Sequence, residues 1–160
     1  MKRKIDLIIY IVLILAIVLT MAFIFGNSMK GPEESSQQSD KVVEIVRPII
    51  DPNQQMTHDE ISFVVRKSAH FIEYLMLGIE CALLAFHISR RLTLAGALYS
   101  AGGCLLSADI DEYIQSFTGR GSAVSDVLLD FSGAIAGITV GFALAYAVRF
   151  VVVRITNKNK

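Results

Sequence analysis

The chain has 160 residues, of which 53% are hydrophobic and 19% are charged, and its mean hydropathy is +0.53. This composition excludes a disordered tail and is unusual for a water-soluble domain. Fifteen Lys and Arg residues balance fifteen Asp and Glu residues, so no net charge attracts the chain to nucleic acid. The two cysteines, Cys81 and Cys104, lie in apolar runs and form no zinc-binding or disulfide pattern.

The first apolar run, residues 7–25, contains 19 residues and no charge. At about 1.5 Å per residue, a helix of this length crosses the roughly 30 Å hydrocarbon core of a bilayer. A cleaved signal peptide is the alternative, because residues 2–4 are all basic. The run is too long for a signal-peptide core, however, and no small-residue cleavage site follows it, so we predict a transmembrane helix.

Three further membrane spans are predicted at residues 69–88, 92–108 and 124–153. The orientation follows from basic residues that all fall on one side of this four-span arrangement: Lys2, Arg3, Lys4, Arg90, Arg91, Arg149, Arg154, Lys158 and Lys160. Because cytoplasmic ends of spans are enriched in Lys and Arg, both termini are predicted to be cytoplasmic. Three basic residues oppose the rule from the outer side and suggest a local role: Arg66, Lys67 and Arg120.

The outer segment between the first two spans is predicted to contain a flexible linker followed by a short helix. Residues 30–39 are polar and typical of a linker. Residues 42–49 have apolar side chains at helical spacing and predict an amphipathic helix on the membrane surface or on the other helices, limited by Pro48 and Pro52. Residues 57–60 have the T-x-x-E form of a capping box that starts the next helix.

The predicted fold class is therefore an all-α integral membrane protein with four transmembrane helices and a short amphipathic helix in the first outer loop. The predicted parts are an N-terminal helix at 1–25, an outer linker and helix at 26–57, a three-helix membrane region at 58–154, and a cytoplasmic tail at 155–160.

Ionisable residues follow one stripe of the second span. At about 100° per residue, a single helix face carries Arg66, His70, Glu73, Glu80 and His87. An ionised carboxylate near mid-membrane costs at least ~2.5 kcal/mol, so Glu80 is expected to be protonated, paired or in a wet interior. For Glu80 and His87, a functional role and a helix-to-helix hydrogen bond are equal alternatives.

The third and fourth spans also carry polar faces. Asp111, Glu112 and Gln115 share a face of the third span, whereas Asp109 points away and is predicted to be solvated. After residues 118–122, the fourth span aligns its carboxylates with a small-residue seam: Asp126, Asp130, Gly133, Gly137 and Gly141. Such a seam predicts close packing against another helix.

These stripes converge at the outer interface and define the candidate site: Arg66, Lys67, His70, Glu73, Asp111, Glu112, Gln115, Arg120, Asp126 and Asp130. Burial of so many ionisable groups requires mutual pairing, and we expect Arg66 or Arg120 to pair with Asp111 or Glu112. Clusters of this kind in membranes usually mark a functional site, and purely structural pairing is the alternative.

The spacings R-K-x-x-H-F-x-E-Y at 66–74 and D-E-x-x-Q-x-F-x-x-R at 111–120, followed by Asp126 and Gly133, resemble the VanZ-like family of small membrane proteins. The resemblance covers roughly residues 66–141, and Asp130 stands where the family pattern usually has Asn. The family's founding member is associated with teicoplanin resistance. The resemblance therefore implies a bacterial cytoplasmic-membrane protein of the cell envelope, without implying a particular reaction.

Three functions are compatible with these residues. In the first, Arg66, Lys67 and Arg120 bind an anionic lipid headgroup, a lipid-linked wall precursor or a lipoglycopeptide, with a phosphate at the N-terminus of the fourth span. No cofactor or metal is assigned in this interpretation, and membrane lipids are its expected partners.

The second function is a membrane-embedded hydrolase or transferase. His70 or Glu73 would act as general base while Asp111, Glu112 or Asp126 holds a divalent ion. The catalytic candidates in this interpretation are His70, Glu73, Asp111 and Glu112. Against it, no Ser or Cys occurs in a recognisable activating motif. In the third function, the polar clusters only hold the helices together or contact another envelope protein.

Overall fold

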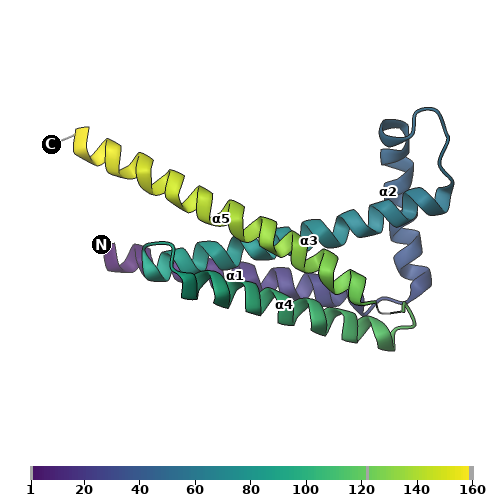
Figure 1. Cartoon of the computed structure of the whole chain (residues 1–160), viewed down its shortest axis with the longest axis horizontal. Coiled ribbons are helices and arrows are strands. Elements are labelled where there is room, and N and C mark those ends of the chain that lie inside the picture. Colours follow the sequence, from purple (N-terminus) through teal and green to yellow (C-terminus); the bar gives the residue numbers. More distant parts are fainter. Residues whose placement is uncertain (1, 122, 159–160) are drawn as a thin grey trace.

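The computed structural model describes residues 2–121 and 123–158, which form five α-helices and no strand. In chain order they are α1 (Lys2–Ser28), α2 (Pro32–Ile50), α3 (His58–Ser89), α4 (Leu94–Phe117) and α5 (Val124–Lys158). Figure 1 shows α1, α3, α4 and α5 running alongside one another, with α2 lying across one end of this bundle. The start of α1 and the end of α5 lie at the opposite end.

Three of the helices are long and apolar enough to cross a membrane, over Arg3–Ser28, His58–Ser89 and Val124–Asn157. The 24 residues of α4 would extend about 36 Å, but this helix, which contains glycines, serines and acidic residues, is not among those three. The all-helical, multi-pass character is confirmed, and the fourth crossing remains a prediction.

The predicted flexible linker at residues 30–39 is wrong, because α2 begins at Pro32. Gly31 is the N-cap, Pro32 occupies the first turn with its φ already suited to a helix, and Glu33 and Glu34 face the positive end of the helix dipole. These signals for the start of a helix outweigh the polar composition that predicted a linker. The helix ends at Ile50, close to the predicted boundary, and its last turn includes Pro48.

The two faces of α2 have different surroundings. Ser35, Ser39 and Val43 are buried, whereas Ile45 and Ile49 are 72% and 77% exposed. The apolar face therefore points away from the bundle and is free to contact a membrane surface, which is one of the two predicted locations.

The connection from α2 to α3 is fixed by polar contacts. The capping box at the start of α3 is confirmed, since Thr57 Oγ1 accepts from the Glu60 N–H at 3.3 Å and a Glu60 carboxylate oxygen accepts from the Thr57 N–H at 2.8 Å. Asp51 accepts the backbone N–H groups of Gln55 and Met56 at 2.8 and 3.0 Å. These hydrogen bonds hold the pKa of Asp51, which lies outside the spans, below its ordinary value.

The glycine seam of α5 packs directly on α3, which confirms the predicted close packing against another helix. A Cβ atom at Gly133 would overlap the carbonyl oxygen of Phe71, and one at Gly137 would overlap that of Leu75. Close approach of the two backbones fixes the depth of α5 against α3. The seam thereby sets the position of Asp130, which lies less than one turn before Gly133.

Candidate functional site

Two adjoining cavities of about 230 and 380 Å³ lie where α2 covers the end of the bundle. They share four lining residues, Ser35, Arg66, His70 and Arg120. We call this pair of cavities the polar cavity. Its other charged lining residues are Lys30, Lys67, Glu73 and Asp126. Seven of the ten predicted site residues line it, so the predicted convergence near this end of the bundle matches the structure: Arg66, Lys67, His70, Glu73, Gln115, Arg120 and Asp126.

The two arginines of the polar cavity come from different elements. Arg66 belongs to α3, and Arg120 lies in the α4–α5 turn between Gly119 and Gly121, whose φ angles are +76° and +71°. Arg120 donates to the backbone oxygen of Asn27 at 3.3 Å. Burial lowers the pKa of Arg120, and the nearby Arg66 adds to this effect, yet a guanidinium stays charged in proteins.

The predicted ion pairs of Arg66 or Arg120 with Asp111 or Glu112 are wrong. Within residues 2–121 and 123–158, neither arginine has a carboxylate within ion-pair distance. The predicted partners accept hydrogen bonds from other groups. Asp111 accepts from Ser28 and Gln115, and Glu112 accepts from a backbone N–H group. Both arginines therefore line the polar cavity without a carboxylate partner in the part of the chain that the structure describes.

The other charged residues of the polar cavity do have partners. Lys67 forms an ion pair with Asp126 that joins α3 to α5. Glu73 accepts a hydrogen bond from the Asn27 side chain at 3.1 Å. Lys30 donates to the Asn27 side chain at 2.9 Å and has no carboxylate partner among the described residues. With Lys67 balanced by Asp126, the polar cavity therefore has three other cations, Lys30, Arg66 and Arg120, and one other carboxylate, Glu73.

Glu112 lies at the start of α5 rather than against an arginine. Its carboxylate accepts the Ala123 N–H at 3.0 Å, directly before the first residue of that helix. An acidic side chain thus occupies part of the helix N-terminus at which a phosphate was predicted, which disfavours an anion at that position. The predicted loop also included Ser122, which lies outside the described residues.

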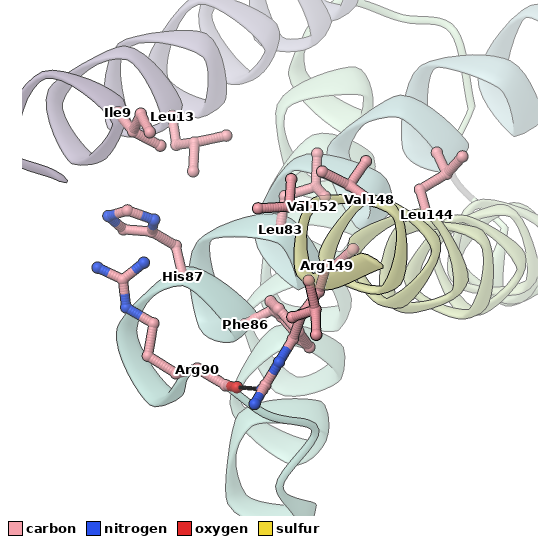
Figure 2. Close-up of a pocket in the computed structure, with 12 residues that line it drawn as sticks. Ile9, Leu13, Leu83, Phe86, His87, Arg90, Leu144, Val148, Arg149 and Val152 are labelled. Atoms are coloured by element: carbon pink, nitrogen blue, oxygen red, sulfur yellow. Dashed lines mark hydrogen bonds between the residues drawn. The ribbon is translucent and has the colours of Figure 1, made fainter. Parts of the chain in front are cut away.

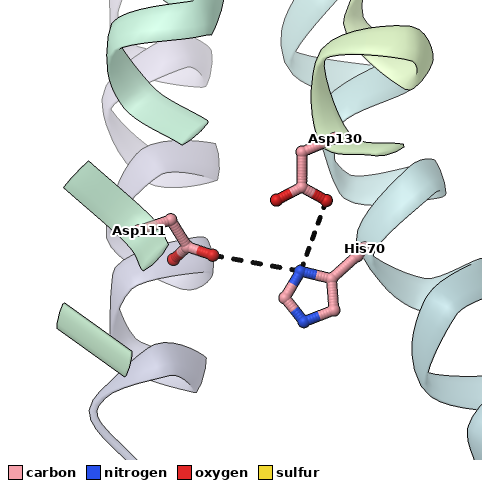
Figure 3. A group of neighbouring side chains, drawn as sticks. All are labelled: His70, Asp111 and Asp130. Carbon is pink, nitrogen blue, oxygen red and sulfur yellow. Dashed lines mark ion pairs between the residues drawn. The ribbon is translucent and has the colours of Figure 1, made fainter. Parts of the chain in front are cut away.

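Behind the polar cavity, one histidine faces two aspartates from neighbouring helices (Figure 3). His70 Nδ1 lies 3.5 Å from an Asp130 carboxylate oxygen and 3.9 Å from one of Asp111. Both aspartate side chains are 0% exposed. Here the structure brings together one residue from each of α3, α4 and α5.

The two aspartates differ in their hydrogen bonding. Asp111 accepts from the Ser28 hydroxyl and, at 2.9 Å, from the Gln115 amide. Neither carboxylate oxygen of Asp130 has a hydrogen-bond partner among the described residues, and the same holds for the buried hydroxyl groups of Tyr74 and Ser107. Asp111 is therefore held by two hydrogen bonds, whereas the 3.5 Å contact with His70 is the polar contact of Asp130 among the described residues.

The remaining stripe residues of α3 contact α1. Glu80 accepts from Thr20 at 3.0 Å, and a ring nitrogen of His87 lies 3.1 Å from the backbone oxygen of Asp6. These contacts favour the helix-to-helix alternative for Glu80 and His87. Asp109 is exposed on α4, as predicted.

A second, apolar crevice of about 740 Å³ lies toward the opposite end of the bundle, between α1, α3 and α5. Figure 2 shows Ile9 and Leu13 of α1 facing Leu83 of α3 and Leu144, Val148 and Val152 of α5, with His87, Arg90 and Arg149 nearby. The crevice is separate from the polar cavity and shares none of its lining residues.

Two site residues at the end of α1 were not predicted. Asn27 contacts both Glu73 and Arg120, and Ser28 is buried while donating to Asp111. Their signal in the sequence is the pair of polar residues that follows the apolar run after Gly26. Periodicity within one helix could not indicate which side chains on other helices they meet.

A family model described as VanZ/LLP1 matches residues 8–147 of the chain. The match includes all ten predicted site residues as well as Asn27 and Ser28. Comparison with curated proteins and with solved structures gave no match.

Proposed function

The chain belongs to the VanZ/LLP1 family, and from this premise we propose that this membrane protein binds the anionic headgroup of an envelope lipid or lipid-tailed compound in its polar cavity. The observation that carries the proposal is the convergence of Arg66 and Arg120, from separate elements, on one cavity without a carboxylate partner for either among the described residues. Two like charges held together favour an anion between them.

The chemistry of the lining residues favours phosphate. A guanidinium presents a planar set of N–H donors that matches phosphate oxygens in two-pronged geometry. Ser35 adds a hydroxyl from α2, and His70 adds a ring nitrogen from α3. The partly enclosed cavity strengthens these interactions because water screens them less.

The location of the polar cavity favours a ligand with an apolar tail. The cavity lies at one end of long apolar helices, beneath an amphipathic helix whose isoleucines point away from the bundle. A headgroup in the cavity would therefore leave its acyl or prenyl chain in the membrane. A lipid-linked wall precursor and a lipoglycopeptide such as teicoplanin both fit this description.

Native mass spectrometry of the full chain in detergent tests this proposal. We expect added phosphatidylglycerol to bind at least tenfold more tightly than phosphatidylcholine, and we expect the combined Arg66→Gln and Arg120→Gln variant to lose this preference. The matched control combines Arg91→Gln with Arg154→Gln, two exposed arginines outside the polar cavity. Equal lipid binding by the wild type and both double variants would refute the proposal.

The same measurement separates the two ligand sources. A lipid-linked diphosphate and a lipoglycopeptide are each added in competition with phosphatidylglycerol. Displacement at lower concentration by the diphosphate indicates a wall precursor, and displacement by the lipoglycopeptide supports a resistance role.

A further inference from the structure

The buried group of His70, Asp111 and Asp130 has an electrostatic imbalance that the polar cavity does not explain. Two carboxylates with no solvent exposure face a single imidazole nitrogen, and both oxygens of Asp130 lack hydrogen-bond partners among the described residues. One imidazole can balance the charge of only one of these carboxylates, and burial of an uncompensated ionised carboxylate is strongly unfavourable. Positive charge, from protons or from a metal ion, has to compensate these two groups.

We propose that His70, Asp111 and Asp130 form a binding site for one divalent cation of the Zn²⁺ or Mn²⁺ type. One ligand atom from each residue lies within 4.8 Å of the other two, so small side-chain rotations bring all three to a metal–ligand distance of about 2.0–2.2 Å. Figure 3 shows the imidazole and both carboxylates pointing toward one another from three helices. The two positive charges of such a cation balance the two aspartate carboxylates, while the histidine stays neutral.

The surroundings have the features of a supported metal site. Ser28 and Gln115 both donate to Asp111, which fixes the carboxylate in the way that outer hydrogen bonds orient metal ligands. The mixture of one imidazole nitrogen and two carboxylate oxygens suits Zn²⁺ and Mn²⁺.

The polar cavity supplies a path for the ion. His70 is 19% exposed and lines both parts of that cavity, whereas the two aspartates lie behind it. An ion bound there would also remove the repulsion that the buried carboxylates exert on an anion in the cavity. The metal site does not depend on the headgroup proposal, because the three ligands exclude both arginines.

Metal titration of the full-length protein in detergent tests the site. The protein is stripped with a chelator, and Mn²⁺ binding is then followed by the loss of the electron paramagnetic resonance signal of the free ion. Zn²⁺ is added in competition. We expect one ion per chain, displaced by Zn²⁺, with affinity reduced at least 100-fold in Asp130→Asn and Asp111→Asn. The matched control is Asp109→Asn, an exposed aspartate on the same helix as Asp111, which should bind like the wild type.

Ser28→Ala provides a variant that keeps all three ligands. It removes one hydrogen bond to Asp111 and should weaken metal binding about tenfold. Binding of less than a tenth of an equivalent by the wild type overturns the proposal and leaves protons as the compensating charge. Unchanged affinity in folded Asp130→Asn and Asp111→Asn protein overturns it as well. Neither result decides whether the arginines bind a lipid headgroup, because neither arginine is a metal ligand.

Discussion

Individual residues in this protein are positioned by partners that lie far away in the sequence. Arg66 and Arg120 were identified from their unusual placement on the outer side of the predicted spans, and both line the polar cavity. Their predicted ion pairs were wrong because the two carboxylates accept hydrogen bonds from other donors. Asp111 accepts from Ser28 and Gln115, and Glu112 accepts from a backbone N–H group. Sequence spacing places a side chain on a helix face, but it does not identify the donor that reaches it from another helix.

Asp51 provides a residue-level test of pH dependence. Hydrogen bonds from the Met56 and Gln55 backbone lower its pKa in the folded state, so its contribution to stability is complete above the ordinary value of 3.8 and is lost as the pH falls through the folded-state pKa. Asp51→Asn offers one acceptor oxygen and no charge. We expect thermal unfolding in detergent to show a less stable variant at pH 7, with the difference shrinking as the pH falls below 3.8 and through the folded-state pKa. A difference independent of pH would contradict this role.

At the scale of elements, the sequence predicted the apolar helices better than the outer segment. Long apolar runs and the T-x-x-E capping box correctly indicated α1, α3 and α5 because these signals depend on neighbouring residues only. The start of α2 also has local helix signals, Pro32, Glu33 and Glu34, although the polar composition of this segment predicted a linker. The orientation of α2 across the bundle depends on tertiary contacts, which no local pattern contains.

The close contact between α3 and α5 leads to a prediction about the stability of the bundle. Gly137→Ala places a methyl group against the Leu75 carbonyl and should destabilise the folded protein by about 1–3 kcal/mol, as overpacking does. Gly102→Ala is the control, because no atom lies within 4 Å of the position of its Cβ apart from its chain neighbours and the nearby backbone of its own helix. Thermal unfolding in detergent should show a lower midpoint for Gly137→Ala only. Similar midpoints for both variants would refute close backbone packing at the seam.

At the scale of the whole molecule, the bundle separates two environments. The residues of the polar cavity and of the buried histidine–aspartate cluster lie toward the end covered by α2. The residues that line the apolar crevice lie toward the other end, where Figure 1 also shows both ends of the described chain. The sequence could predict this separation because charges cluster at the ends of apolar runs. It could not predict the cavity, which requires α2 to be folded over the bundle.

The orientation of the bundle in the membrane is tested by cysteine labelling. In a background lacking Cys81 and Cys104, we expect Gln37→Cys and Ser116→Cys to react with an impermeant thiol reagent on intact cells, because the basic clusters predict this end to be outside. Thr156→Cys should react only after the cells are opened. The opposite labelling pattern would move the polar cavity to the cytoplasmic side.

The most direct test of headgroup binding is ligand protection inside the polar cavity. Ser35 is buried and lines both parts of the cavity, so Ser35→Cys, in a background without other cysteines, places one thiol there. The measurement is the rate of reaction with a neutral thiol reagent in vesicles of phosphatidylcholine with or without phosphatidylglycerol, and exposed Gln37→Cys is the reference. We predict that phosphatidylglycerol slows labelling at Ser35→Cys at least fivefold, and that this protection disappears when Arg66 and Arg120 are replaced by Gln. Equal labelling rates at Ser35→Cys in both vesicle types would contradict the account.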